Sequence, residues 1–206
     1  EDLERLAATQ GLALISDEVF ADYAFASDER RAPTLARDGA ALTFTLGGLS
    51  KSCGLPQLKL AWIAVTGPET ARRHALERLE VVADTYLSVS TPVQVAGPAL
   101  LARLEELQAP LRERTRRNLE ELRGRLSAGS PASLVDPEGG WSAILRVPAT
   151  IGEEERVLRL LDERNVRVQP GYFFDFPREA YLVVSLLCPP ETFDEGVDRI
   201  LSDVVL

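Results

Sequence analysis

The chain has 206 residues, 45% of them hydrophobic, and its 23 basic and 32 acidic residues give a formal net charge of −9. This composition can form a buried core, and the scattered basic residues argue against nucleic acid as a partner. Cys53 and Cys188 show no spacing typical of a disulfide scaffold or a zinc site. No apolar run approaches the roughly 20 residues that span a bilayer, and no signal peptide is recognisable, so we expect a cytoplasmic protein without a membrane partner.

The chain begins inside a predicted helix. Residues 2–10 have helical apolar spacing, Gly11 is well placed to end the helix, and the sequence contains no methionine. We therefore expect a fragment or a processed product, and we expect the part that would precede residue 1 to carry some of the functional site.

The first half of the chain is predicted to form an α/β layer. Apolar runs at residues 12–15, 41–46 and 60–65 predict three short buried strands. Such runs are typical of strands in the middle of a sheet that is covered on both faces.

Longer helices connect this layer to a smaller α+β unit. One helix is predicted from residue 68 to 87, and after Thr91-Pro92 a second helical stretch runs from 93 to 126. Strands at 142–147, 166–169 and 181–187 and helices at 153–164 and 191–201 complete the chain. We expect two domains, residues 1–100 and residues 101–206.

A lysine among small and apolar residues is the first candidate for chemistry. Lys51 lies in the segment Leu-Gly-Gly-Leu-Ser-Lys-Ser-Cys-Gly-Leu-Pro, residues 46–56. Desolvation in such a turn lowers the proton affinity of an amine and frees it to act as a nucleophile. A loop lysine is more often a solvated surface residue, so composition alone does not decide between the two interpretations.

Acidic residues directly after a predicted strand form the second candidate. Asp17 and Glu18 follow the apolar run that ends at Ile15. Carboxylates at the carboxyl end of a strand lie where open α/β sheets bind ligands. The alternative is that Asp17 or Glu18 simply caps the next turn.

Together these segments resemble the class I and II aminotransferases of fold type I. The sequence Ser-Asp-Glu-Val-Phe at residues 16–20 is followed, 34 residues after Asp17, by Leu-Ser-Lys with Gly-Leu-Pro and a basic residue beyond. Further motifs follow in family order: Thr91-Pro92-Val93-Gln94, Gly139-Gly140-Trp141, Pro170-Gly171 and Tyr181-Leu182. The resemblance covers nearly the whole chain and implies the C-terminal half of such an enzyme, with part of its large α/β domain and its small α+β domain.

The resemblance also implies a pyridoxal phosphate cofactor. Lys51 matches the lysine that holds this cofactor as a Schiff base and moves the proton at the substrate Cα. Asp17 matches the aspartate that keeps the pyridine nitrogen protonated, and Ser50 and Lys59 match contacts to the phosphate. An amino-acid or amine substrate and a homodimer are implied as well.

Three positions near the cofactor depart from the family pattern. Phe20 replaces a tyrosine whose phenol donates a hydrogen bond to the cofactor, and phenylalanine cannot donate one. Gly48 replaces a phosphate-binding serine. Lys59 replaces an arginine and supplies charge without a bidentate fork, so this side of the phosphate site is expected to be weaker.

A fourth departure concerns the substrate. The family normally reads Tyr-Leu-Arg-Leu-Ser where this chain has Tyr-Leu-Val-Val-Ser at residues 181–185. The arginine binds the α-carboxylate of the substrate, and Val183 offers neither charge nor donor. Arg178, in the preceding loop, is one candidate to replace it.

Three functions remain open from the sequence. An aminotransferase with Lys51 as its catalytic residue is the leading hypothesis, and an α,β-eliminating lyase shares the same scaffold. Product analysis separates the two, because a lyase releases ammonia and a keto acid without an amino acceptor. A non-catalytic family member is the third hypothesis, favoured by the four departures and disfavoured by Lys51 and Asp17. We expect the fragment itself to be inactive.

Overall fold

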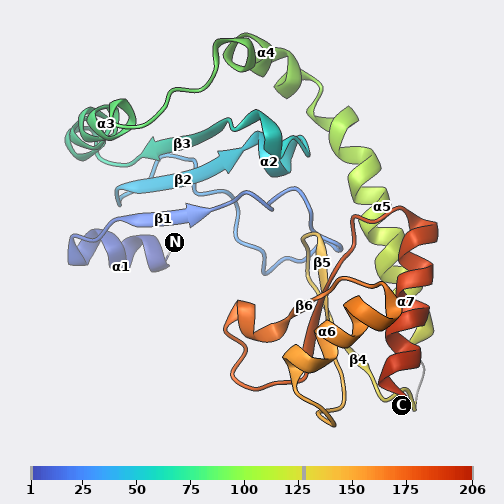
Figure 1. The fold of residues 1–206 in the computed structure, drawn as a ribbon. Helices are drawn as coiled ribbons and strands as arrows, with labels where there is room; N and C mark the ends of the chain where they lie inside the picture. Colours follow the sequence, from blue (N-terminus) through green and yellow to red (C-terminus); the bar gives the residue numbers. More distant parts are fainter. Residues whose placement is uncertain (1, 127–128, 206) are drawn as a thin grey trace. The chain divides into compact units, whose positions relative to one another are not determined.

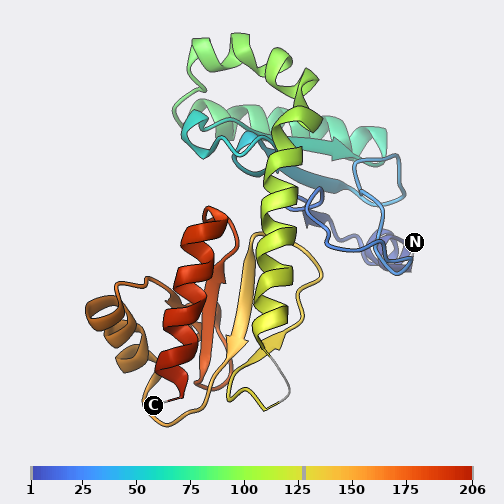
Figure 2. The same ribbon diagram turned by 90° about the vertical axis from the view of Figure 1, so that its right-hand side faces the viewer.

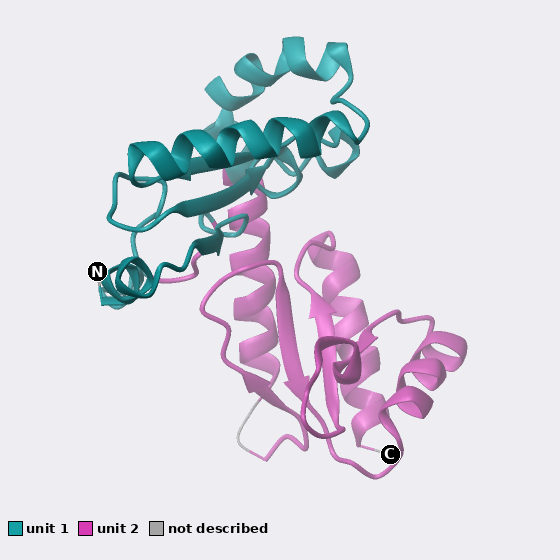
Figure 3. Ribbon diagram, turned by 90° about the vertical axis from the view of Figure 1, so that its left-hand side faces the viewer, with its two compact units in different colours: residues 1–22, 27–108 teal, residues 23–26, 109–206 magenta. Residues whose placement is uncertain are grey.

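The computed structural model describes residues 2–126 and 129–205. The chain forms two compact units, one from residues 1–22 and 27–108 and one from residues 23–26 and 109–206 (Figure 3). The strands are β1 (Leu14–Asp17), β2 (Thr43–Gly48), β3 (Ala61–Thr66), β4 (Ser133–Val135), β5 (Ser142–Arg146), β6 (Gln169–Pro170) and β7 (Tyr181–Ser185). The helices are α1 (Asp2–Gln10), α2 (Leu49–Ser52), η1 (Pro56–Leu58), α3 (Glu69–Asp84), α4 (Thr91–Ala102), α5 (Leu104–Arg125), α6 (Glu153–Arg164), η2 (Gly171–Phe174) and α7 (Pro190–Val204).

The first unit is built on a three-stranded sheet of order β1-β2-β3. β1 and β2 are parallel, and β2 and β3 are antiparallel. Figure 1 shows the three strands side by side, with α2 directly after the end of β2. α3 packs against the sheet, where Ala75 and Leu79 line a groove together with Phe44 of β2. The predicted α/β architecture of this half is confirmed.

The outer strands of this sheet are more exposed than the sequence predicts. Ile15 in β1 is 73% exposed, and Ile63 in β3 is 46% exposed. β1 and β3 are the two edges of the sheet in the described part of the chain, so each has a hydrogen-bonded neighbour on one side only. In the described part of the chain these two strands are therefore not in the middle of a sheet, because an apolar run cannot show whether its neighbours are present; for the whole protein the prediction stays a prediction.

The predicted helical stretch 93–126 is two helices. α4 ends and α5 begins on either side of Arg103, which leaves helical geometry with φ −107° and ψ 20°. The Arg103 guanidinium pairs with Glu106 in the first turn of α5, with a nitrogen-to-oxygen distance of 2.5 Å. α5 then continues from the first unit into the second, and the predicted domain boundary after residue 100 stays a prediction about the whole protein.

The second unit is an antiparallel sheet of order β4-β5-β7-β6 with helices on it. Figure 2 shows α5 and α7 running alongside the strands. The buried side chains of the core come from both helices, from α6 and from the two central strands: Leu119, Leu122, Ala143, Leu145, Leu160, Leu182, Val184, Phe193, Val197 and Ile200. The predicted α+β character is confirmed, although the three-residue strand β4 was not predicted because its pattern is too short.

Residues 23–26 belong to the second unit. Ala24 pairs with Gly139 as an isolated antiparallel bridge, and the Gly140 N–H donates to the Tyr23 carbonyl at 2.9 Å. The rings of Tyr23 and Trp141 meet edge to face with centroids 5.1 Å apart. A Cβ at Gly139 would lie 2.7 Å from the Tyr23 carbonyl oxygen, so this close approach of two backbones requires glycine.

Every helix among the described residues is too short or too polar to cross a membrane.

Candidate functional site

The predicted cofactor residues lie at one edge of the first sheet. Asp17 is the last residue of β1, and Ser50 and Lys51 lie in α2, which begins directly after β2. Because β1 and β2 are parallel, their carboxyl ends meet at the same edge. The Glu18 N–H extends this pairing by donating to the Leu46 carbonyl at 3.2 Å. This edge is where open α/β sheets bind ligands.

Lys51 lies in the short helix α2, whose first residue is bound to the chain that leads into β3. Leu49, two residues earlier, is fully buried, and its N–H donates to the Leu60 carbonyl at 3.0 Å, which ties α2 to the beginning of β3. Lys51 is itself half-buried, and its Nζ lies 5.6 Å from the centroid of the Phe20 ring. An ammonium at this distance is attracted by the face of the ring. Phe20 therefore contacts the candidate catalytic amine directly, a role that the sequence did not predict.

Cys53 closes the same turn. Its N–H donates to the Leu49 carbonyl at 3.1 Å, and its side chain is buried. Burial raises the pKa of the Cys53 thiol, which disfavours the reactive thiolate. Its proximity to Lys51 in the sequence therefore does not indicate a second nucleophile.

Asp17 and Glu18 have different local roles. Asp17 is exposed, and its Oδ1 accepts the Val19 N–H at 3.2 Å, which is the turn contact that the alternative interpretation predicted. Among the described residues its carboxylate has no ion-pair partner, which leaves it suited to a cationic ligand group.

Glu18 instead organises a loop. Its carboxylate accepts hydrogen bonds from the Thr34 hydroxyl at 2.6 Å, the Leu35 N–H at 2.8 Å and the Ser16 hydroxyl at 3.0 Å. Burial alone would raise the pKa of Glu18, but these three hydrogen bonds outweigh it and lower the pKa below its usual value. Sequence reasoning missed this network, because two of its three partners lie 16 and 17 residues away along the chain.

The remaining cofactor candidates lie beside the start of β3. Lys59 is exposed, has a left-handed backbone with φ 53°, and immediately precedes the Leu60 carbonyl that holds α2. Gly48 lies opposite Ala61 in the sheet register, and a Cβ at Gly48 would lie 3.3 Å from the Ala61 Cβ. The glycine that replaces the family's serine is thus packed against its neighbour, and the missing hydroxyl is not supplied by Ala61.

These two lysines are the only lysines in the 206-residue sequence; the other 21 of its 23 basic residues are arginines. Both lie at the same edge of the first sheet. Lysine is the side chain that supplies a nucleophilic amine, whereas arginine stays protonated in proteins. The chain therefore carries its side-chain amines only at the candidate site.

Val183 belongs to the second unit. It lies in β7 opposite Ile144 of β5 and is only 9% exposed. A nearly buried valine among strand neighbours offers no donor to a carboxylate, as the sequence predicted. His74 is exposed on α3 and lies outside the edge that carries Lys51.

Comparison with known proteins gives a consistent result. The family of class I and II aminotransferases matches residues 1–200. The chain is 28% identical over 211 residues to an aspartate aminotransferase of Streptomyces avermitilis, covering 97% of this chain and 50% of that protein. It is 26% identical over 190 residues to an alanine aminotransferase of Mycobacterium bovis, covering 86% of this chain and 42% of that protein.

Solved structures show the same fold. A pyridoxal-phosphate-dependent aminotransferase from Streptococcus suis superposes with a TM-score of 0.81 at 22% identity, covering 99% of this chain and 51% of that chain. An α-aminoadipate aminotransferase from Thermus thermophilus, solved with a phosphopyridoxyl-leucine, gives a TM-score of 0.73 at 24% identity, covering 99% and 53%. The chain thus spans about half the length of the relatives it matches.

Proposed function

The chain belongs to the class I and II aminotransferase family, and on that premise we propose that the whole protein is a pyridoxal-phosphate-dependent aminotransferase that acts through Lys51. The observation that supports this most directly is that Asp17, Ser50 and Lys51 lie at the carboxyl edge of one sheet. The resemblance to the family further supports a homodimer, and we propose that the enzyme works in the cytoplasm.

The residues at this edge fit the cofactor chemically. Lys51 supplies an amine for its aldehyde, and Asp17 supplies an exposed carboxylate for its pyridinium nitrogen. The Ser50 hydroxyl and the Lys59 ammonium suit its phosphate. Gly48 contributes no hydroxyl, so we propose that this side of the phosphate depends on Ser50 and Lys59.

Each side chain then has a distinct task. When bound, pyridoxal phosphate provides an electron sink for the charge left when a bond at the substrate Cα breaks. The Asp17 carboxylate holds the proton on the pyridine nitrogen, because an adjacent negative charge favours the charged form of that nitrogen. The Lys51 amine takes and returns the proton at the substrate Cα as a general base and acid. The Phe20 ring orients the Lys51 side chain by their contact.

The substrate must be recognised without an arginine at position 183. Val183 is nearly buried beside Ile144, so neither a charge nor a hydrogen-bond donor is present at this point of β7. We propose an amine, or an amino acid whose carboxylate is bound by other residues, as the amino donor.

Two observations favour a second candidate function, a family member that no longer catalyses. The nearly buried Val183 removes a binding group, and packing of Gly48 against Ala61 leaves little room to restore another. Such a protein would keep the fold without turnover.

The test is to locate the cofactor adduct. The chain and its full-length parent are mixed with pyridoxal phosphate, reduced with borohydride, digested and examined by peptide mass. Within these 206 residues Lys51 and Lys59 are the only lysines, so a modified lysine in this part of the protein has just two possible positions. We expect the adduct on Lys51 in the full-length protein.

Two conservative variants sharpen this result. Lys51→Arg keeps the charge and removes the reactive amine, so the adduct should be lost. Lys59→Arg is the matched control, and its adduct on Lys51 should persist. No adduct in the full-length protein would favour the non-catalytic alternative, and an adduct on Lys59 alone would refute the assignment of Lys51.

A further inference from the structure

The second unit contains a cavity that uses none of the proposed cofactor residues. Its volume is about 580 Å³, within the range of small-molecule sites. Its apolar walls are Pro131, Val147, Pro148, Ala149 and Ala180. Arg146, Arg178, Glu179 and Ser133 supply its polar groups.

Arg146 reaches this cavity from the face of the sheet opposite the core. Ala143 and Leu145 of β5 are fully buried in the core, whereas Arg146 is exposed, as alternation along a strand requires. Arg146 pairs with Tyr181 in the register of β5 and β7.

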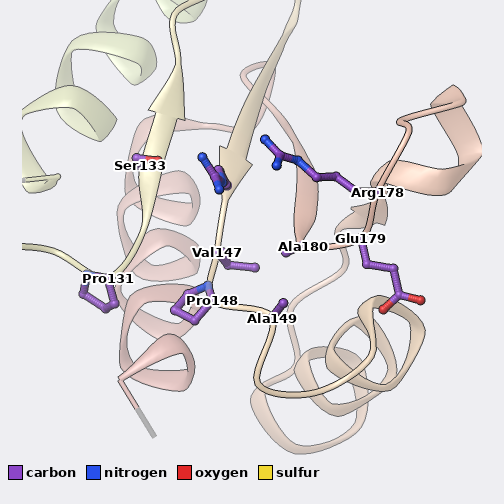
Figure 4. Close-up of a pocket in the computed structure, with 9 residues that line it drawn as sticks. Pro131, Ser133, Val147, Pro148, Ala149, Arg178, Glu179 and Ala180 are labelled. Atoms are coloured by element: carbon purple, nitrogen blue, oxygen red, sulfur yellow. The ribbon is translucent and has the colours of Figure 1, made fainter.

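Arg178 reaches the cavity from a loop that is pinned on both sides. Phe176 stacks on Tyr181 with ring centroids 4.6 Å apart, and the Val147 N–H donates to the Ala180 carbonyl at 2.9 Å. Ala180 is held at φ 85°, a backbone conformation that is uncommon for alanine. The loop therefore presents Arg178 in a defined place, and Figure 4 shows the side chain extending inward over the cavity.

The positive charge at this cavity is not compensated by the protein. Among the described residues, neither the Arg146 nor the Arg178 side chain takes part in a hydrogen bond or an ion pair, whereas many other arginines of the chain form ion pairs. Glu179 is the one acidic residue that lines the cavity. Its Oε2 accepts the Glu153 N–H at 3.4 Å, and Figure 4 shows its carboxylate pointing away from Arg178.

We propose that this cavity is a binding site for a small organic acid, whose carboxylates are bound by Arg146 and Arg178. Guanidinium groups bind carboxylates through two parallel hydrogen bonds, and two of them suit a dicarboxylate. The apolar walls favour an organic acid over inorganic phosphate, because only the former has a carbon skeleton to bury. The site requires no cofactor, so it goes beyond the proposed function.

The test is isothermal titration of the chain with succinate at low ionic strength, where screening is weak. Arg146→Gln and Arg178→Gln should each weaken succinate binding by about tenfold or more, since each removes charge-assisted hydrogen bonds. Arg167→Gln is the matched control, because Arg167 is exposed in the same unit but does not line the cavity. It should change the affinity less than about twofold.

Two further ligands decide the chemical class. Succinamide has the same skeleton without charge and should not bind, and inorganic phosphate should bind more weakly than succinate. The proposal is overturned if succinate does not bind, if succinamide or phosphate binds as well as succinate, or if Arg167→Gln weakens binding as much as the cavity variants. Circular dichroism of each variant checks that it is folded. None of these outcomes depends on transaminase activity.

Discussion

A buried ion pair in the second unit allows a sharp test of the structure. Asp203 of α7 is 1% exposed and Arg156 of α6 is 2% exposed, and the Arg156 Nη1 lies 3.0 Å from the Asp203 Oδ2. Arg159, which is 28% exposed, approaches the same oxygen at 2.8 Å. Asp203→Ala would leave the buried Arg156 charge without its counter-ion.

The loss in the free energy of unfolding depends on the hydrogen bonds that Arg156 would keep. Its Nη2 still donates to the Pro148 carbonyl at 3.1 Å and to the Thr150 hydroxyl at 3.0 Å, so it would not lose all its partners. Removing one partner of a buried pair costs about 3–5 kcal/mol, and these two hydrogen bonds place Asp203→Ala near the lower end. Urea unfolding followed by circular dichroism measures the change in the free energy of unfolding.

Two further variants complete the experiment. Asp198→Ala, on the same helix, removes an ion pair with Arg125 whose aspartate is 71% exposed, and it should cost less than about 1 kcal/mol. The double variant Arg156→Met with Asp203→Leu should recover much of the loss, because apolar groups of similar size can replace a buried pair. A loss for Asp203→Ala no larger than for Asp198→Ala would refute the reasoning.

Three further outcomes are expected. Because its folded-state pKa is lowered, ionised Glu18 stabilises the fold at pH values above the ordinary carboxylate pKa, and this stabilisation is lost as the pH falls through the lower folded-state pKa. In thermal melts between about pH 3 and 6, the melting temperature of Glu18→Gln should therefore fall less with pH than that of the unchanged chain. Cys53, whose buried thiol has a raised pKa, should react about tenfold or more slowly than the half-buried Cys188 with a thiol reagent in the native chain, and equal rates would contradict its burial. Gly48→Ser should cost about 1–3 kcal/mol in urea unfolding because its Cβ would lie 3.2 Å from the Leu60 carbonyl oxygen and 3.3 Å from Ala61, and adding Ala61→Gly should restore only part of that loss, since the backbone contacts remain.

The elements of this fold were predictable where periodicity and end signals agree. The helix Glu153–Arg164 was predicted with its observed bounds, and it ends at Asn165 in the left-handed conformation that favours asparagine. The break between α4 and α5 at Arg103 was not predictable, because an arginine at this position does not indicate non-helical backbone angles. Exposure of Ile15 was missed for a different reason: an apolar run indicates a strand, whereas burial depends on neighbouring segments.

The candidate site was predictable as a location but not as a network. Two strands that end in Asp17 and shortly before Lys51 place both residues at one edge if the strands are parallel, and they are parallel. Two features of the site depend on side-chain positions, which sequence spacing does not predict: the contact of Phe20 with Lys51 and the loop held by Glu18. Alternation along β5 would have placed Arg146 on the face opposite the core, but nothing in the sequence connects it with Arg178.

The distribution of basic residues bears on whether the chain descends from a working enzyme. Arginine makes up 21 of the 23 basic residues, and lysine is found only at positions 51 and 59. If the site served only to maintain the fold, arginine at either exposed or half-buried position would keep the charge as well as lysine does. An amine that must be nucleophilic cannot be replaced in this way, because a guanidinium stays protonated. A lysine at position 51 in a chain with 21 arginines is therefore consistent with the proposed amine chemistry at this edge of the sheet.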